Sequence, residues 1–276
     1  MSGDGPVPFR ARRLGRKFRE MREAAGFTLE RAGKYFDMSG SALQRWETGE
    51  TKPNVNVVRS MMDLYDCRPE GLLDEVRAVR NLKAGEGFDY ADAEEEADLA
   101  RELTLLHVPG LLQTEHYMRA LFARVFPPWG MDKINRVTLS RLNRKDRLMS
   151  VERPLQAHVI MAESALHTPV GGREVMGAQL RLIAELAALP TVTVQVIPLA
   201  RGAHGGMRAE FALLTFPYPD YPGMLFVPFV NGAKREDKEG ALEGARLLFE
   251  HVSCEALAPN ESVELIERLA GDLYGP

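Results

Sequence analysis

Three hydrogen-bonding side chains, Ser41, Gln44 and Arg45, fall within the short stretch of residues 39–53, SGSALQRWETGETKP. Ser41 and Arg45 are four residues apart, so a helix would place them on one face, with Gln44 beside them. The guanidinium group of arginine can donate two hydrogen bonds to guanine, and the amide of glutamine can bind adenine. The spacing therefore predicts a helix face that is able to read base edges.

Other polar residues around this stretch could hold the phosphates of a duplex. Thr48 and Lys52 follow the expected helix, while Thr28 and Ser39 stand where helix N-caps are expected. Basic residues between positions 10 and 16 could reach the backbone or a minor groove from a flexible start. Phosphate contacts of these kinds position a protein on DNA without reading its sequence.

The charge of the chain is divided unevenly along its length. The 276 residues, enough for about two domains, carry a net charge of −4. Residues 1–83 contain 16 Lys and Arg against 12 Asp and Glu, and the remainder contains 19 against 27. A basic first third suggests contact with nucleic acid, although a solvated basic face would give the same count.

Composition also limits the class of protein. Only two cysteines are present, Cys67 and Cys254, which argues against a disulfide framework or a Cys-rich zinc site. The sequence lacks an apolar run near the roughly 20 residues of a membrane span, and its start lacks the apolar segment of a secretory signal. We therefore expect a cytoplasmic protein that makes no contact with a membrane.

Five short helices are expected to position the reading face. The first begins near Arg10 and ends at Gly26, in the position of a left-handed C-cap. The second follows Thr28, the third follows Ser39, the fourth opens at Asn54, and the fifth covers residues 72–79. The residues expected to face inward on the second and third helices are Leu29, Ala32, Tyr35, Phe36, Leu43 and Trp46.

The remaining residues predict a different class of fold. Residues 84–98 are acidic and indicate a linker that runs into a helix start. Helices are expected at 94–106, 113–126, 131–149 and 173–189 and near 238–257 and 261–273, with strands at 155–162, 191–199, 210–216 and 224–230. Their order favours a mixed sheet flanked by helices. The predicted protein is multidomain, with an all-α five-helix domain (1–83), an acidic linker (84–98) and an α/β, or α+β, domain (99–276).

Residues 26–53, GFTLERAGKYFDMSGSALQRWETGETKP, resemble the helix-turn-helix of the Cro/cI type, also called the xenobiotic-response-element family. The resemblance rests on Gly26 before the second helix, on Ser39 as the cap of the third, and on the run of residues 46–53. It implies a DNA-binding domain in which the third helix enters the major groove.

The resemblance also implies roles for particular residues. A structural pair would form between Arg22 and Glu47, and the base-reading positions would be Gly40, Ser41 and Arg45. Because Gly40 has no side chain, one reading position cannot donate or accept through a side chain. The predicted DNA-binding residues are Thr28, Ser39, Gly40, Ser41, Gln44, Arg45, Thr48 and Lys52.

A second resemblance covers most of residues 90–270. The blocks at 108–122, 163–172, 176–187, 192–206 and 211–217 are similar, in this order, to the C-terminal domain of actinobacterial, Streptomyces-like regulators, a domain without an assigned function. The resemblance implies a small cognate protein encoded nearby, in an antitoxin-like arrangement. Pro228 stands where that group often has a short acidic motif.

Two candidate regions for a partner or a ligand stand out in the second domain. One contains Gln113, Glu115 and Tyr117, and packing alone would also account for these three residues. The other is the Gly-rich run ARGAHGGMR at 200–208, where Arg201, His204 and Arg208 could help to cradle an anion or simply belong to a loop.

The functional prediction is a sequence-specific, DNA-binding transcriptional regulator, expected as a homodimer on double-stranded DNA. Its C-terminal domain would bind a small partner protein or a ligand. The alternatives are an antitoxin-like protein that sequesters a small cognate protein, and a small-molecule sensor. An enzyme is not expected, nor a cofactor or a metal, because the sequence lacks HExxH, GxSxG and phosphate-binding loop motifs.

Overall fold

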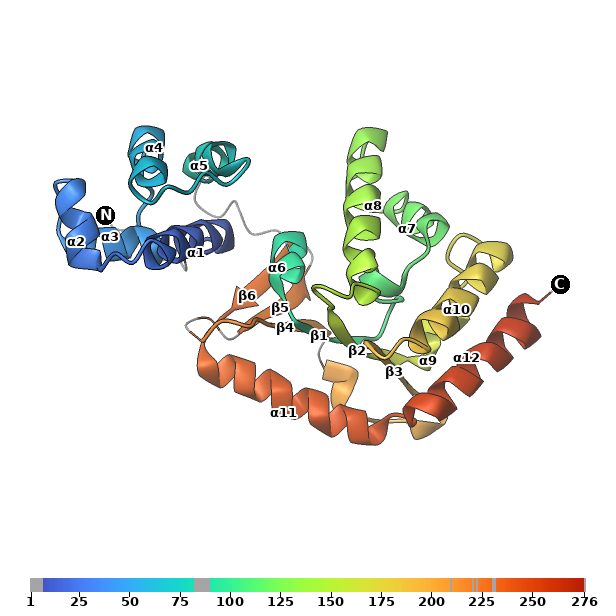
Figure 1. The fold of residues 1–276 in the computed structure, drawn as a ribbon. Helices are drawn as coiled ribbons and strands as arrows, with labels where there is room; N and C mark the ends of the chain where they lie inside the picture. The colour runs from blue at the N-terminus through green and yellow to red at the C-terminus, as the bar shows by residue number, and fades with distance from the viewer. Residues whose placement is uncertain are drawn as a thin grey trace. The chain divides into compact units, whose positions relative to one another are not determined.

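The computed structural model describes residues 7–81, 90–208, 210–219, 221, 223–229 and 232–275. The chain divides into two compact units, Met1–Asp92 and Ala93–Pro276. The first is a run of helices, and the second contains a six-stranded sheet with helices (Figure 1). This confirms the predicted multidomain fold class.

Five helices form the first unit around one apolar core. They are α1 (Phe9–Ala24), α2 (Leu29–Tyr35), α3 (Gly40–Glu47), α4 (Val55–Leu64) and α5 (Leu72–Arg80). Thr28, Ser39 and Asn54 each accept a hydrogen bond from the backbone N–H three residues ahead, at the starts of α2, α3 and α4. These caps satisfy donors that a helix start leaves without a partner.

Glycines allow the backbone around α3 to pack closely. A Cβ atom on Gly15 of α1 would lie 2.5 Å from the carbonyl oxygen of Glu47, and one on Gly33 of α2 would lie 2.7 Å from that of Met38. A Cβ atom on Gly49, which has a φ of +77°, would lie 2.6 Å from the carbonyl carbon of Ala11. Side chains at these positions would push α3 away from α1 and α2.

The inward face of α2 was predicted correctly except at one position. Ala32 is fully buried, and Leu29 and Phe36 pack against the core. Tyr35 was expected to face inward, but 62% of it is exposed. Its position is about 100° around the helix from that of Phe36, because one turn takes 3.6 residues.

The second unit is built on a mixed sheet, as predicted. Its strands are β1 (Leu99–Thr104), β2 (Gln156–Ala162), β3 (Val192–Ile197), β4 (Phe211–Thr215), β5 (Gly223–Phe229) and β6 (Gly232–Glu236). The spatial order is β3-β2-β1-β4-β5-β6, in which β1, β2 and β3 are parallel and the other pairs are antiparallel.

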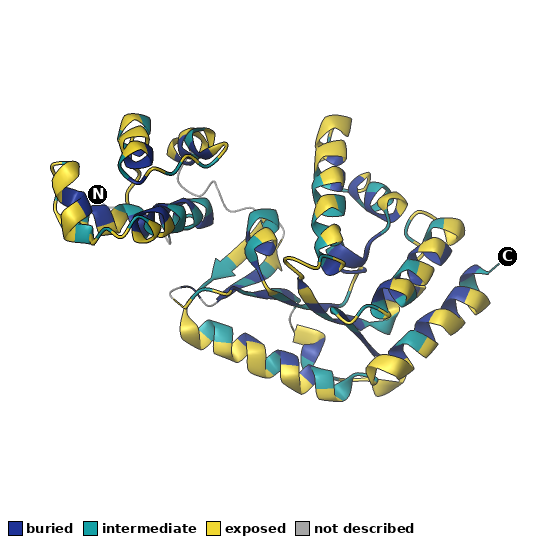
Figure 2. Ribbon diagram, in the orientation of Figure 1, coloured by how far each residue is buried: buried dark blue, intermediate teal, exposed yellow. Residues whose placement is uncertain are grey.

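Helices cover both faces of this sheet (Figure 1). They are α6 (Tyr90–Glu96), α7 (Glu115–Phe122), α8 (Met131–Lys145), α9 (Glu163–His167), α10 (Arg173–Ala187), α11 (Glu239–Glu255) and α12 (Pro259–Tyr274). Phe249 of α11 packs on Leu103, Ile160 and Leu213, which point to one face. Figure 2 shows the outer side of α11 exposed and its sheet side more buried. Met118, Phe122 and Ile134 form a smaller core between α7 and α8.

One predicted helix of this unit is wrong. The expected helix at 94–106 is instead the end of α6 followed by β1. The sequence LARELT is rich in helix-forming residues, but β1 lies between β2 and β4 and exchanges backbone hydrogen bonds with both. This pairing overrides the local preference. Strand β6 and helix α9 were not predicted. Within the described residues, none of the helices has the length and hydrophobicity that a membrane span requires.

Candidate nucleic-acid interface

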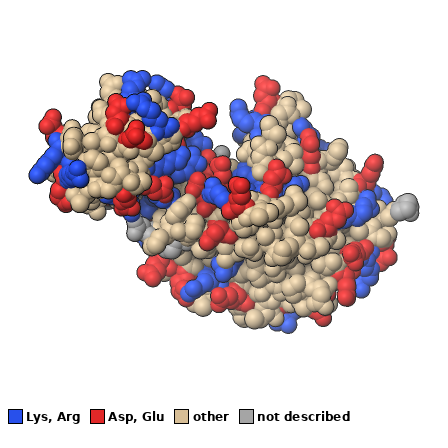
Figure 3. Space-filling model, in the orientation of Figure 1, with Lys and Arg blue, Asp and Glu red and all other residues tan. Residues whose placement is uncertain are grey.

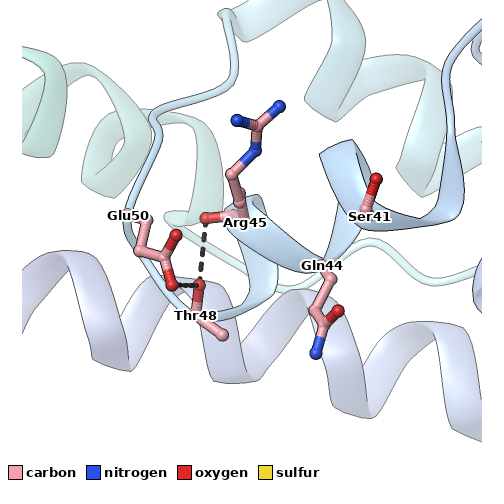
Figure 4. Close-up of a pocket in the computed structure, with 5 residues that line it drawn as sticks. All are labelled: Ser41, Gln44, Arg45, Thr48 and Glu50. Carbon is pink, nitrogen blue, oxygen red and sulfur yellow. Dashed lines mark hydrogen bonds between the residues drawn. The ribbon is translucent and has the colours of Figure 1, made fainter.

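The exposed side of α3 carries the side chains that were expected to read base edges. Ser41, Gln44 and Arg45 are all exposed. Together with Thr48 and Glu50 they line a shallow depression of about 380 Å³ (Figure 4). All five come from α3 or from the loop that follows it, and the Arg45 side chain extends from the helix away from Gln44.

The start of α3 is fixed by Ser39. Its Oγ accepts a hydrogen bond of 3.2 Å from the backbone N–H of Ala42 and lies 3.0 Å from the Oγ of Ser41. Gly40 is the first residue of the helix, and a Cβ atom there would lie 3.4 Å from Glu30. The cap therefore fixes the N-terminal end of α3, the end that a recognition helix presents to bases.

The loop after α3 carries a carboxylate, that of Glu50, which the sequence prediction did not place on this face. The Thr48 hydroxyl lies 3.1 Å from Oε1 of Glu50 and 3.3 Å from the carbonyl oxygen of Arg45 (Figure 4). The left-handed turn at Gly49 precedes Glu50. Gly49 was the only feature of the sequence that indicated this turn. Lys52 is exposed farther along the same loop and is not among the five lining residues.

A buried ion pair holds α3 against α1. Nε of Arg22 donates to Oε1 of Glu47 at 2.6 Å, and Nη2 donates to Oε2 at 2.9 Å. The two side chains are 8% and 1% exposed, and the hydrogen bond that Arg22 donates to Glu47 raises the pKa of Arg22. Burial, together with the charge of Glu47, raises the pKa of Tyr65 to about 12. Such a pair fixes geometry more than it adds net stability.

The basic residues near the start do not form a flexible arm. Arg10, Arg12, Arg13 and Arg16 all lie within α1, as the helix expected from near Arg10 implies, so they do not act from a flexible start. Arg13 forms an ion pair of 3.1 Å with Glu75 of α5. The buried apolar residues that alternate with these arginines recur at a helical spacing and continue α1 back to Phe9. Figure 3 shows Asp and Glu interspersed among Lys and Arg on the surface in view.

The first candidate region of the second unit is mostly internal. Gln113 is buried, donates to the carbonyl oxygen of Val108 at 2.7 Å and accepts from Arg141 at 2.7 Å. Tyr117 is also buried, its hydroxyl accepts from the N–H of Val108 at 3.2 Å, and burial raises its pKa. Glu115 is exposed and pairs with Arg119.

The second candidate region is tied to α11. Glu255 accepts hydrogen bonds from Arg201 at 3.0 Å and from the backbone N–H of Gly205 at 2.7 Å, and the bond from Gly205 lowers the pKa of this carboxyl. His204 is half-buried and Arg208 is exposed. The segment that contains His204 and Arg208 contacts α11, whereas the segment that contains Gln113, Glu115 and Tyr117 contacts α8 and α10. The structure therefore does not bring the two groups into one site.

Two further glutamates act in the same way at the ends of parallel strands. Glu210 accepts from the N–H groups of Leu105 and Leu106 at 2.6 and 3.0 Å, after β1. Glu163 accepts from the N–H of Leu199 at 2.7 Å, after β3. The carboxyl ends of parallel strands are where α/β folds place ligands, but here carboxylates of the chain itself engage these N–H groups. Within the described residues, no cluster of three or more His, Cys, Asp or Glu is arranged to hold a metal.

Together, the short turn between α2 and α3 and the polar exposed face of α3 define the first unit as a helix-turn-helix domain. A model of the helix-turn-helix domain matches residues 13–76, and a model of a domain of unknown function (DUF5753) matches residues 88–268. The chain belongs to the family that this second domain defines. This layout is that of a xenobiotic-response-element-type regulator followed by a domain of unknown function. No curated protein and no solved structure matches the chain significantly.

Proposed function

We propose that this protein is a sequence-specific transcriptional regulator whose helix α3 enters the major groove of DNA. The observation that carries the proposal is the shared exposure of Ser41, Gln44 and Arg45 on one face of α3. The opposite face buries Leu43 completely. A polar face on a helix that is fixed from behind meets the requirement for direct readout, because base recognition needs defined positions of donors and acceptors.

In this proposal the residues have separate roles. Arg45 donates two hydrogen bonds to a guanine, and Gln44 or Ser41 contacts a neighbouring base. Lys52 and the capped starts of α2 and α3 face phosphates, because a helix N-terminus presents backbone N–H groups. A homodimer would place two such helices on half-sites related by a two-fold axis, about one helical turn apart.

The test begins with the full chain and a pool of random-sequence duplexes. The enriched duplex and its shuffled version are then bound by the native protein and by Arg45→Ala. The variant should lose about 1–3 kcal/mol of discrimination at one base pair. Arg59→Ala, an exposed arginine on α4, is the matched control for the loss of one charge. If Arg45→Ala enriches the same sequence with unchanged discrimination, the role assigned to Arg45 is wrong.

For the second domain we propose a regulatory role in the cytoplasm, in which it binds a second copy and a small cognate protein. The support is the sequence resemblance and a groove of about 510 Å³ between α10 and α12. Its lining residues include Leu180, Arg181, Ala184, Glu267 and Gly271. Native mass spectrometry of the chain, alone and co-expressed with small proteins encoded beside its gene, measures both stoichiometries. A monomer that binds none of them would overturn this role and favour a test for metabolites by thermal shift.

A further inference from the structure

The proposed DNA-reading face has an unusual balance of charge. Among its five lining residues, Arg45 is the one base and Glu50 the one acid. A protein gains affinity for any duplex by neutralising phosphates with Lys and Arg. A carboxylate within such a face works against this gain, so its presence calls for a physical account.

Glu50 also engages a neighbouring hydrogen-bond donor. The Thr48 hydroxyl has a single proton, and its two acceptors in the structure are the Glu50 carboxylate at 3.1 Å and the Arg45 carbonyl oxygen at 3.3 Å. Both acceptors belong to the protein. Threonine hydroxyls at DNA interfaces commonly donate to phosphate oxygens. In this arrangement that proton is directed to the protein instead.

We propose that Glu50 limits the affinity of this interface for DNA of any sequence. Its carboxylate repels the phosphate that would approach the end of α3, and it holds the Thr48 hydroxyl in an internal hydrogen bond. The inference rests on the proposed DNA-binding function and adds a residue that opposes binding. Its consequence is that contacts to phosphates contribute less, so the base contacts of Arg45 contribute a larger share of the binding free energy.

The first measurement is the affinity of the full chain for a shuffled duplex, by fluorescence anisotropy at several salt concentrations. Glu50→Gln should bind about three- to tenfold more tightly near 0.1 M salt, because a repulsive charge is removed close to a phosphate. Glu50→Lys should bind still more tightly, and its plot of log affinity against log salt should steepen by about 0.9. Glu70→Gln, an exposed acid between α4 and α5, makes the same change of charge elsewhere and should change affinity less than about twofold.

The second measurement tests the hydrogen bond. Thr48→Val should cost more affinity in a Glu50→Ala background than in the native background, because the hydroxyl then lacks the Glu50 acceptor and can donate to a phosphate. Equal costs in the two backgrounds would remove the Thr48 part of the proposal. Equal affinities of Glu50→Gln and Glu70→Gln would overturn the proposal as a whole.

Two outcomes separate this inference from the proposed function. If Glu50→Gln weakens binding to the enriched duplex and relaxes the preference at one base, Glu50 is a base-reading residue and the inference is wrong. If Glu50→Gln tightens binding to every duplex while Arg45→Ala leaves the enriched sequence unchanged, the inference holds and the assignment of sequence reading to Arg45 fails.

Discussion

The exposed face of α3 and the carboxyl ends of β1 and β3 are both rich in polar groups, but they use them differently. On α3 the side chains of Gln44 and Arg45 are exposed and line a shallow depression. After β1 and β3, backbone N–H groups already donate to Glu210 and Glu163. A polar cluster can take an external ligand only if its own chain does not satisfy it first. The first region meets that condition better.

The two regions also differ in what holds them in place. Helix α3 depends on a buried ion pair and on glycines that permit close backbone contact. The strand ends depend on carboxylates that accept backbone hydrogen bonds. Substituting the residues that hold each region therefore tests whether the exposed face of α3 binds DNA and whether the strand ends are only structural.

The largest effect is expected from Glu47→Ala. The substitution removes the carboxylate that accepts two hydrogen bonds from the buried Arg22, which keeps Glu23 and the carbonyl oxygen of Phe27. It should destabilise the first unit by about 3–5 kcal/mol. Chemical denaturation followed by Trp46 fluorescence, in a Trp129→Phe background, reports on this unit. Replacing both partners, as Arg22→Met with Glu47→Leu, should recover much of the loss. A cost below about 1 kcal/mol for Glu47→Ala would show that the pair does not hold α3.

A smaller loss of stability is expected when the carboxylate at the end of β1 is removed. Glu210→Ala removes the acceptor of the Leu105 and Leu106 N–H groups, which should cost the second unit about 1.5–3 kcal/mol. Glu210→Gln retains an acceptor and should cost less. Trp129 fluorescence during denaturation measures the change, in a Trp46→Phe background. The comparison between the two regions would fail if Glu210→Ala weakened DNA binding while leaving the stability of the second unit intact.

The next largest loss of stability is expected from a steric clash between α1 and α3, behind the reading face. Gly15→Ala places a Cβ atom 2.5 Å from the carbonyl oxygen of Glu47, and overpacking of this kind costs about 1–3 kcal/mol. The displaced α3 should also bind the enriched duplex less well. Gly130→Ala meets no atom within 4 Å and is the control for the change from Gly. Equal denaturation midpoints for the two variants would contradict the close approach of α1 and α3.

The reading face could be predicted from sequence because its signals are local. Caps at Thr28, Ser39 and Asn54 and a regular helical spacing define α2, α3 and α4 over a few residues each. Strand β1 could not be predicted in this way. Its residues favour a helix, and its extended state is imposed by β2 and β4, which come more than 50 and more than 100 residues later.

The candidate site residues also divide into those set by local spacing and those brought together by distant parts of the chain. The side chains of Ser41, Gln44 and Arg45 lie together because they share one helix, whose period fixes their spacing. Glu50 lies beside them because the chain turns at Gly49, which has a left-handed backbone conformation. The sequence indicates a turn there but does not indicate where the side chain after it will point. In the second unit, the partner of Arg201 is Glu255, which lies 54 residues away. Sequence spacing cannot predict that pair.

The smallest predicted effect concerns a polar network inside the second unit. His158 hydrogen-bonds to Gln195 at 2.8 Å and packs edge-on against Phe249, and its burial lowers its pKa, with a further contribution from Arg101. The unfolded chain therefore binds a proton at His158 at a higher pH than the folded chain does. Stability from this group is present above the unfolded pKa, near 6.5, and is lost as pH falls below it.

Denaturation midpoints measured between about pH 7.5 and pH 5 should therefore fall with pH in the native chain and fall less in His158→Asn. His116→Asn, at an exposed position on α7, keeps His158 and should retain the native slope. If the two variants had the same dependence on pH, protonation of His158 would not be coupled to unfolding. The result also bears on the contrast between the regions, because a partly buried histidine whose protonation is disfavoured lies within the second unit, whereas α3 exposes the charged side chain of Arg45.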